Sequence, residues 1–133
     1  MNGNVNMDLG NDLNGMWDIN RIKQLVSNLV KNALEHGDSK SPVEVTARVE
    51  GDDVVLTVHN EGSAIPRERQ HLIFQPFKHP NVGEEKRERA PHSLGLGLYI
   101  VKQIVDAHNG ALVLESSAES GTTFTVRLPK KPR

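Results

Sequence analysis

The spacing of apolar residues predicts a long amphipathic helix from about Asn20 to His36. Its apolar side chains recur three and four residues apart: Ile22, Leu25, Val26, Leu29 and Ala33, flanked by Val30 and Leu34. Residues at this spacing share one face of a helix, so that face is expected to be buried. Asp18, just ahead of the run, is the expected N-cap. A polar stripe of Asn28, Asn32 and His36, each four residues from the last, runs beside the apolar face.

Alternating apolar and polar residues predict the strands. We expect an edge strand at 5–9, one hairpin of strands 43–49 and 54–58 around a turn at 51–53, and a second hairpin of strands 112–115 and 122–128 around Gly121. A helix precedes the first hairpin, and further helices lie between the two. This order predicts an α+β fold: a two-layer α/β sandwich with a mixed, mostly antiparallel sheet of about five strands and three helices on one face.

Two shorter helices are expected between the hairpins. One should start near Pro66 and end at the Phe74–Phe77 pair. Helical spacing then resumes from Leu98 to His108, and we expect His108 to act as a capping cation at the end of this helix. Asn109-Gly110 closes the helix.

Two segments with few apolar residues are expected to lie outside the core. Residues 78–93 carry a run of charges, which is typical of a solvated loop, and a long loop inside a small domain is often a lid. Residues 129–133 are predicted to be a flexible basic tail. The remaining residues supply enough apolar surface for one core, so we expect residues 1–133 to form a single domain.

Composition excludes several classes of function. The formal net charge of −1 gives no bulk attraction to nucleic acid or to an acidic membrane, and we expect neither as a partner. The chain has no cysteine, which excludes disulfides, thiolate metal sites and a cysteine nucleophile. No apolar run approaches the length of a membrane span, and the N-terminus lacks the layout of a signal peptide, so a cytoplasmic location is expected.

Three glycine-bearing segments lie at the ends of predicted elements: 60–66 after a strand, 93–98 opening a helix, and 121–124 opening the last strand. Glycine at a helix N-terminus lets backbone N–H groups approach a phosphate. The dinucleotide-binding fingerprint does not fit, because its third glycine is missing and a polar loop precedes the segment.

The amide pair Asn28 and Asn32 adds a second element of the same chemistry. Isolated asparagines on a helix are usually solvated surface. Amide oxygens, however, suit a hard cation and amide N–H groups suit a phosphate. Together with the glycine-bearing segments, the pair predicts a site for a metal-chelated polyphosphate.

In this order and spacing, five motifs resemble the ATP-binding catalytic domain of sensor histidine kinases, within the wider family of gyrase-, Hsp90- and MutL-like ATPases. The motifs are NLVKNALEH at 28–36 (the N box), NEGSAIP at 60–66, IFQPF at 73–77 (the F box), LGLGLYIV at 94–101 and GTTF at 121–124. The resemblance covers nearly the whole chain, from about residue 5 to residue 128. The combination of motifs looks most like the kinases of bacterial phytochrome-type sensors.

The resemblance implies a role for each matching residue. Asn32, with Asn28 assisting, would coordinate the Mg²⁺ that bridges the ATP phosphates, and His36 would bind a phosphate oxygen. Asn60 would accept a hydrogen bond from the adenine amino group. Further ATP contacts are implied for Gly62, Ile65, Leu94, Gly95, Leu96, Gly97, Leu98 and Thr122. Residues 78–93 would form the ATP lid, Phe74 and Phe77 would pack its hinge, and Lys78 or His79 would approach the γ-phosphate.

Some positions depart from the pattern of the family. Asn60 stands where relatives carry an acid, so the bond to adenine would lack charge assistance and ATP affinity should be modest. Glu35 occupies a position where many relatives carry a lysine near the phosphates. Glycines of the family are replaced at three positions: Ala64, Ser93 and Glu119.

One position separates the branches of the family. Relatives that hydrolyse ATP, and the anti-sigma serine kinases, carry a glutamate as general base where this chain has Asn28, which has no useful basicity. We therefore expect a histidine kinase domain that donates the γ-phosphoryl group to a histidine on a separate dimerisation and phosphoacceptor domain. A response regulator would then be an indirect partner.

No histidine of this chain stands in a phosphoacceptor motif, so the sequence is expected to be an excised or partial domain. Two alternatives remain at this stage. One is a nucleotide-dependent protein-binding module with degenerate kinase activity, and the other is an anti-sigma-type serine kinase.

Overall fold

The computed structural model describes residues 5–9, 15, 17–38, 40–62, 64–70, 72–75 and 96–131. The elements follow in the order β1 (Val5–Leu9), α1 (Ile19–His36), β2 (Val43–Glu50), β3 (Asp53–Asn60), α2 (Arg67–Gln70), the 3₁₀ helix η1 (Leu72–Phe74), α4 (Gly97–Ala107), β4 (Ala111–Ser117) and β5 (Gly121–Pro129).

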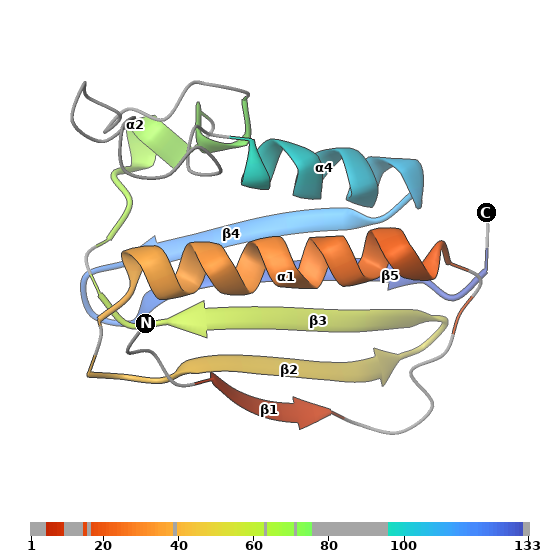
Figure 1. The fold of residues 1–133 in the computed structure, drawn as a ribbon, viewed down its shortest axis with the longest axis horizontal. Helices are drawn as coiled ribbons and strands as arrows, with labels where there is room; N and C mark the ends of the chain where they lie inside the picture. Colours follow the sequence, from red (N-terminus) through yellow and green to blue (C-terminus); the bar gives the residue numbers. More distant parts are fainter. Residues whose placement is uncertain are drawn as a thin grey trace.

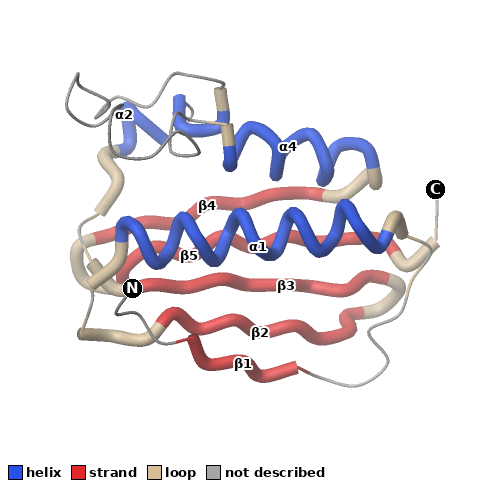
Figure 2. The backbone as a smooth tube through the Cα atoms, viewed as in Figure 1, coloured by secondary structure: helices blue, strands red, loops and turns tan. Residues whose placement is uncertain are grey.

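The five strands form one sheet in the order β1-β2-β3-β5-β4. β1 runs parallel to β2, and every other pair is antiparallel. Both long helices, α1 and α4, lie on the same face of this sheet (Figures 1 and 2). The predicted two-layer α/β sandwich with a mixed, mostly antiparallel sheet is therefore confirmed.

The core lies between the two helices and the sheet. On α1, Leu25 and Leu29 are fully buried, and Asp18 caps the helix by accepting hydrogen bonds from the N–H groups of its first turn. Val58 of β3 and Phe124 of β5, also fully buried, meet the helices from the sheet side. Burial of each large apolar side chain contributes about 1.5–3 kcal/mol, which makes this interface the main source of stability.

The opposite face of the sheet carries a network of charges. Val55 points to this face yet is only 4% exposed, between Arg48 and Arg127 on the neighbouring strands. Arg127 pairs with Glu50 at 2.8 Å and with Asp53 at 3.1 Å, and Arg48 also pairs with Glu50. Hydrogen bonds from Arg127 and Arg48 lower the pKa of the Glu50 carboxyl. The arginine stems cover the valine while their charged ends join β2, β3 and β5.

The helix predicted from Pro66 to Phe77 is wrong in its extent. Two short pieces, α2 and η1, take its place, and residues 71 and 76–77 lie outside the described residues. The four residues of α2 are polar and none is buried, so nothing fixes a longer helix against the core. Burial starts only at Ile73 of η1, which is 7% exposed.

His108 ends α4 as predicted, and its ring bonds to two backbone groups. The Asp18 N–H donates to its Nε2 at 3.2 Å, and its Nδ1 lies 2.8 Å from the Ile104 carbonyl oxygen. The ring therefore joins the end of α4 to the start of α1, and its charge as a capping group stays a prediction.

The predicted flexible tail at 129–133 is also corrected at its start. Pro129 is the last residue of β5, and its carbonyl oxygen accepts a hydrogen bond from the Trp17 indole Nε1 at 2.8 Å. The Lys130 N–H donates to the Asp52 carbonyl oxygen at 2.9 Å. Residues 132–133 lie outside the described part of the chain.

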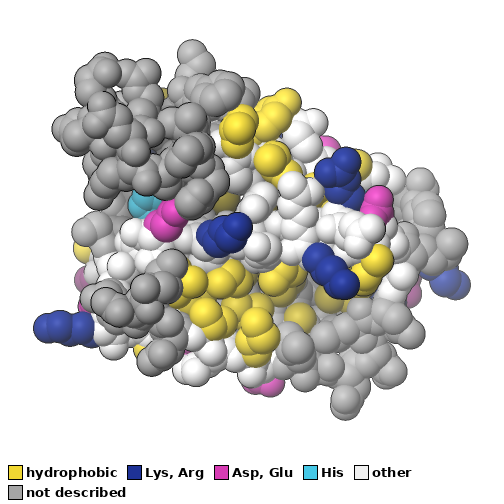
Figure 3. All heavy atoms as spheres, in the orientation of Figure 1, with side chains coloured by type: hydrophobic (Ala, Val, Ile, Leu, Met, Phe, Trp, Pro, Cys, Tyr) yellow, Lys and Arg dark blue, Asp and Glu magenta, His cyan; other side chains and the backbone are white. Residues whose placement is uncertain are grey.

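Apolar side chains gather on the helix-bearing face, alongside α1 and toward the β1 edge of the sheet (Figure 3). Two large hydrophobic residues from these elements, Met7 of β1 and Ile19 of α1, are 61% and 59% exposed.

Among the described helices, none combines the length and apolar character needed to cross a bilayer.

Candidate functional site

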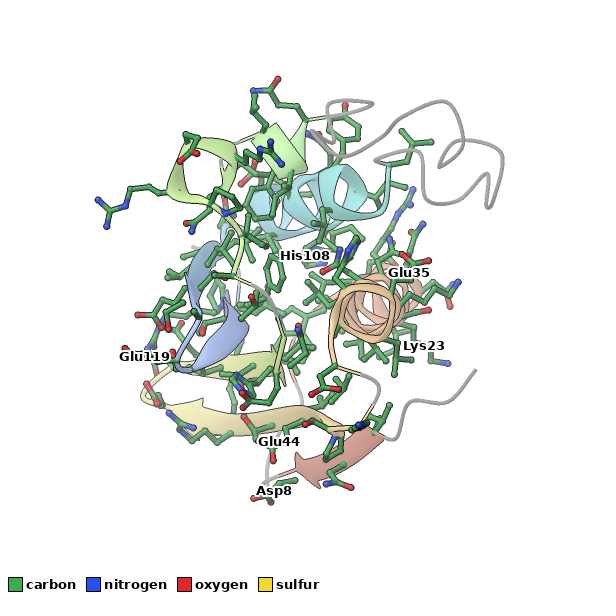
Figure 4. The ribbon with its side chains drawn as sticks, turned by 90° about the vertical axis from the view of Figure 1, so that its left-hand side faces the viewer. Asp8, Lys23, Glu35, Glu44, His108 and Glu119 are labelled. Atoms are coloured by element: carbon green, nitrogen blue, oxygen red, sulfur yellow. The ribbon has the colours of Figure 1, made fainter. Side chains whose placement is uncertain are left out.

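Predicted site residues from several elements meet at one end of the sheet. β3 ends at Asn60, which pairs with Thr122 near the start of β5. The end of α1 lies against this point, because a Cβ built on Gly37 would come within 3.0 Å of the Asn60 Cβ. Figure 4 views the molecule from this end, with Glu35 near the end of α1 and Glu119 in the turn between β4 and β5. Residues predicted for the adenine side are thus neighbours in space.

Asn60 is 4% exposed, and its amide is held in one orientation. Its Nδ2 donates to the Glu61 carbonyl oxygen at 3.1 Å. The Glu61 carbonyl oxygen takes one of the two Nδ2 hydrogens, and the amide oxygen Oδ1 can accept a hydrogen bond from a ligand. The same Glu61 carbonyl accepts the Asp38 N–H at 2.7 Å, which ties this loop to the end of α1. Gly62, with φ of +141°, packs so closely that a Cβ would come within 3.2 Å of the His36 carbonyl oxygen.

A chain of hydrogen bonds joins this loop to β5 through Ser116, a residue that the sequence did not single out. The Ile65 N–H donates to Ser116 Oγ at 2.8 Å, and Ser116 Oγ lies 2.7 Å from Thr122 Oγ1. A signal for Ser116 was present. It continues the alternation of Leu112 and Leu114, so a hydroxyl stands where the pattern predicts an apolar residue facing the helices.

The side predicted to hold phosphates is built from α1 and the start of α4. Asn28 Nδ2 donates to the Gly97 carbonyl oxygen at 3.3 Å and so fixes the first turn of α4 beside α1. Leu96, the N-cap of α4, makes no side-chain capping bond. The first N–H groups of such a helix lack intrahelical acceptors and favour an anion. Asn32, one turn after Asn28, is half-buried, and His36 is exposed.

Leu98 does not offer its side chain to a ligand. It is 3% exposed and packs in the core with Val101 and Val105 of the same helix. The contact predicted for Leu98 can therefore come only from its backbone N–H, which lies in the first turn of α4. Gly97 differs, since a Cβ built there would meet no described atom within 4 Å.

Several predicted site residues lie outside the described residues. They are the whole predicted lid at 78–93, which includes Lys78 and His79, and the neighbouring residues Phe77, Leu94 and Gly95. Phe74, the other predicted hinge residue, is described: its ring meets that of Phe124 edge-on, with centroids 6.0 Å apart. Of the two predicted hinge residues, Phe74 therefore packs against the core.

The amide pair fits the requirements of a magnesium ion that arrives with a polyphosphate. Asn28 engages its N–H with Gly97 and keeps its oxygen, and Asn32 offers a second amide oxygen one turn away. Mg²⁺ prefers oxygen ligands and usually keeps several waters and substrate phosphates, so one or two protein oxygens suffice. No cluster of three His, Asp or Glu side chains in the described residues could hold a metal.

Comparison with known proteins places these features in a family. The family model for histidine kinase-, DNA gyrase B- and HSP90-like ATPases matches residues 17–132. The alginate biosynthesis sensor protein KinB of Pseudomonas aeruginosa is 32% identical over 94% of this chain and 20% of its own length. A bacteriophytochrome of the same species is 36% identical over 84% of this chain and 15% of its own.

Among solved structures, the nucleotide-free catalytic domain of the histidine kinase ThkA superposes with a TM-score of 0.80 at 32% identity. The match covers 98% of this chain and 82% of that one. This chain therefore spans about four-fifths of that solved catalytic domain, but a fifth or less of the two curated relatives named above. The presence of a bacteriophytochrome among the relatives agrees with the predicted phytochrome-type resemblance.

Proposed function

The chain belongs to the family of histidine kinase-, DNA gyrase B- and HSP90-like ATPases, and we propose that it binds Mg-ATP and donates the γ-phosphoryl group to a histidine on a separate phosphoacceptor domain. One observation carries the proposal. Asn60 is a buried amide that lies against Gly37 at the end of α1, and Asn28 of the same helix bonds to Gly97 at the start of α4. These are the groups needed to read a purine and to hold a chelated triphosphate.

The purine side would bind by hydrogen bonds and packing. Asn60 Oδ1 would accept the adenine amino group, since its Nδ2 is engaged by Glu61. Thr122 would supply a hydroxyl, and Gly62 and Ile65 would shape the wall of the pocket. A neutral acceptor gives a weaker bond than a carboxylate does, so we expect competent but modest ATP affinity.

The phosphate side would act by position and charge. The first N–H groups of α4 would bind phosphate oxygens, and the oxygens of Asn32 and Asn28 would hold the magnesium ion in place. The ion, when bound, neutralises charge on the phosphates, which is the main demand of phosphoryl transfer. Lys78, His79, Leu94 and Gly95 remain predictions for this side.

Asn28 favours transfer to a partner over hydrolysis. Its amide has no basicity near neutral pH and is bonded to Gly97, so it cannot activate water or a serine hydroxyl. The base and the acceptor histidine would then lie on the partner domain. In this proposal a response regulator receives the phosphoryl group indirectly, the domain works in the cytoplasm, and neither nucleic acid nor a membrane is contacted.

The proposal is tested by mixing the chain with γ-labelled Mg-ATP and dimerisation and phosphoacceptor domains from related sensor kinases. We expect acid-labile, alkali-stable phosphate on the added domain, and loss of transfer with Asn32→Ala. Chelation of magnesium should also abolish transfer. Binding of Mg-ATP without transfer to any domain would refute the kinase and favour a nucleotide-dependent binding module. Label on serine would favour the anti-sigma type instead.

A further inference from the structure

We propose that Ser116 is a positioning residue that makes the Thr122 hydroxyl a hydrogen-bond donor and so selects 6-aminopurine over 6-oxopurine nucleotides. The inference rests on the proposed function and deepens it. Ser116 closes β4 next to Thr122 of β5, and Thr122 in turn is the ladder partner of Asn60 of β3. The three side chains therefore form a row across the end of the sheet, on the face that carries the helices.

One arrangement of the hydrogens along this row leaves a donor on Thr122. The Ile65 N–H can only donate, so it occupies one lone pair of Ser116 Oγ. Ser116 Oγ and Thr122 Oγ1 lie 2.7 Å apart and either can be the donor; in this proposal Ser116 is the donor. In the part of the chain that the structure describes, this is the only side-chain bond of Thr122, so its own hydrogen is left for a ligand. The reverse assignment would strand the free hydrogen on Ser116, one strand further from Asn60.

The row then presents an acceptor beside a donor. Asn60 offers Oδ1 as the acceptor, because the bond from Nδ2 to the Glu61 carbonyl fixes which way the amide points. Thr122 offers the donor. Such a pair fits a base edge with an amino group next to an unprotonated ring nitrogen, which is the edge of adenine. A 6-oxopurine shows the opposite order, with an oxygen next to a ring N–H, and would leave buried polar groups unpaired.

Loss of Ser116 would free the Thr122 hydroxyl to turn. It could then accept from the ring N–H of a 6-oxopurine as readily as it donates to adenine. A purely structural role would weaken every nucleotide alike, whereas a positioning role changes the ratio between the two bases. The ratio is therefore the diagnostic quantity.

The experiment is titration calorimetry of the full chain with Mg-ATP and with Mg-ITP, which has the 6-oxo group and no 2-amino group. We expect the wild type to bind ATP at least about tenfold more tightly than ITP. Ser116→Ala should lose about three- to tenfold in ATP affinity while ITP affinity stays within about twofold. Ser116→Thr, which keeps the hydroxyl on a strand-compatible side chain, should restore the ratio.

A matched control is available in the next residue. Ser117 bonds to Ser120 within the β4–β5 turn, and Ser117→Ala should leave the ATP-to-ITP ratio unchanged. Equal losses for both nucleotides in Ser116→Ala, or a wild type that does not discriminate, would overturn the inference while leaving ATP binding intact. A wild type that binds neither nucleotide would refute the proposed function itself. If Ser116→Ala does not fold, Ser116→Cys, with a weaker donor, is judged by the same ratio.

Discussion

Alanine at Gly121 should destabilise the domain far more than alanine at Gly51. Both glycines have positive φ, +79° at Gly121 and +62° at Gly51. An L-residue in this region costs about 1–2 kcal/mol, and this share is common to both sites. The surroundings differ. A Cβ at Gly51 would meet nothing within 4 Å, but at Gly121 it would lie 2.3 Å from the Asn60 carbonyl oxygen and 3.2 Å from the Glu61 Cα.

Because the atoms in the way at Gly121 are backbone, they can yield only if β3 or β5 shifts. Forcing an extra group into a packed site adds about 1–3 kcal/mol. We therefore expect a loss of about 1 kcal/mol for Gly51→Ala and about 3 kcal/mol for Gly121→Ala. The shift would also move Asn60, so Gly121→Ala should weaken Mg-ATP binding while Gly51→Ala leaves it unchanged.

Urea unfolding followed by far-UV circular dichroism gives both free energies of unfolding, and calorimetry at a temperature where both variants are folded gives the affinities. Equal losses of stability in the two variants would refute the close approach at Gly121. So would a Gly121→Ala protein that binds Mg-ATP as tightly as the wild type, since Asn60 could not then have moved.

Three further predictions concern charge. Asn60→Asp should lower stability by about 1–3 kcal/mol and fail to improve ATP affinity, because a carboxylate oxygen would replace Nδ2 against the Glu61 carbonyl; tighter binding at unchanged stability would contradict this. Glu35→Lys should raise Mg-ATP affinity about threefold at low salt and less at high salt, by removing a like charge near the phosphates; a salt-independent change in calorimetry would count against it. Since Arg127 holds the pKa of Glu50 low, that pair stabilises the fold at neutral pH and loses its effect as pH falls through the lowered pKa. The stability difference between wild type and Glu50→Gln in urea should thus vanish once the pH lies below the lowered pKa of Glu50, and a difference that grows on acidification would refute the sign.

Local periodicity predicted most of the fold. Val43, Val45 and Ala47 are all buried, as their alternation with polar residues required. Leu25 and Leu29 face the sheet, as their four-residue spacing required. These elements could be predicted because a two-layer fold buries one face of each, and the period of the pattern reveals which face.

Features that depend on distant partners could not be predicted in this way. The ring of His108 bonds to the N–H of Asp18, 90 residues away in the chain, and nothing near His108 encodes that contact. Ser116 acquires its place from Ile65, 51 residues away. At the site, motifs indicated Asn28, but its bond to Gly97 emerges only from the packing of two helices. Hydrogen bonds between side chains of distant elements depend on the tertiary structure, and the local pattern of a single sequence does not predict them.

The indole of Trp17 fastens the start of α1 to the end of β5 by its bond to Pro129, at the opposite end of α1 from Asn32 and His36. It is also the one tryptophan of the chain. Its fluorescence therefore reports on the contact between the start of α1 and the end of β5, at the opposite end of α1 from the proposed nucleotide site. Emission that stays constant during nucleotide titration would mean that binding changes only the residues near the ligand. A spectral change would mean that binding also changes the contact between Trp17 and Pro129.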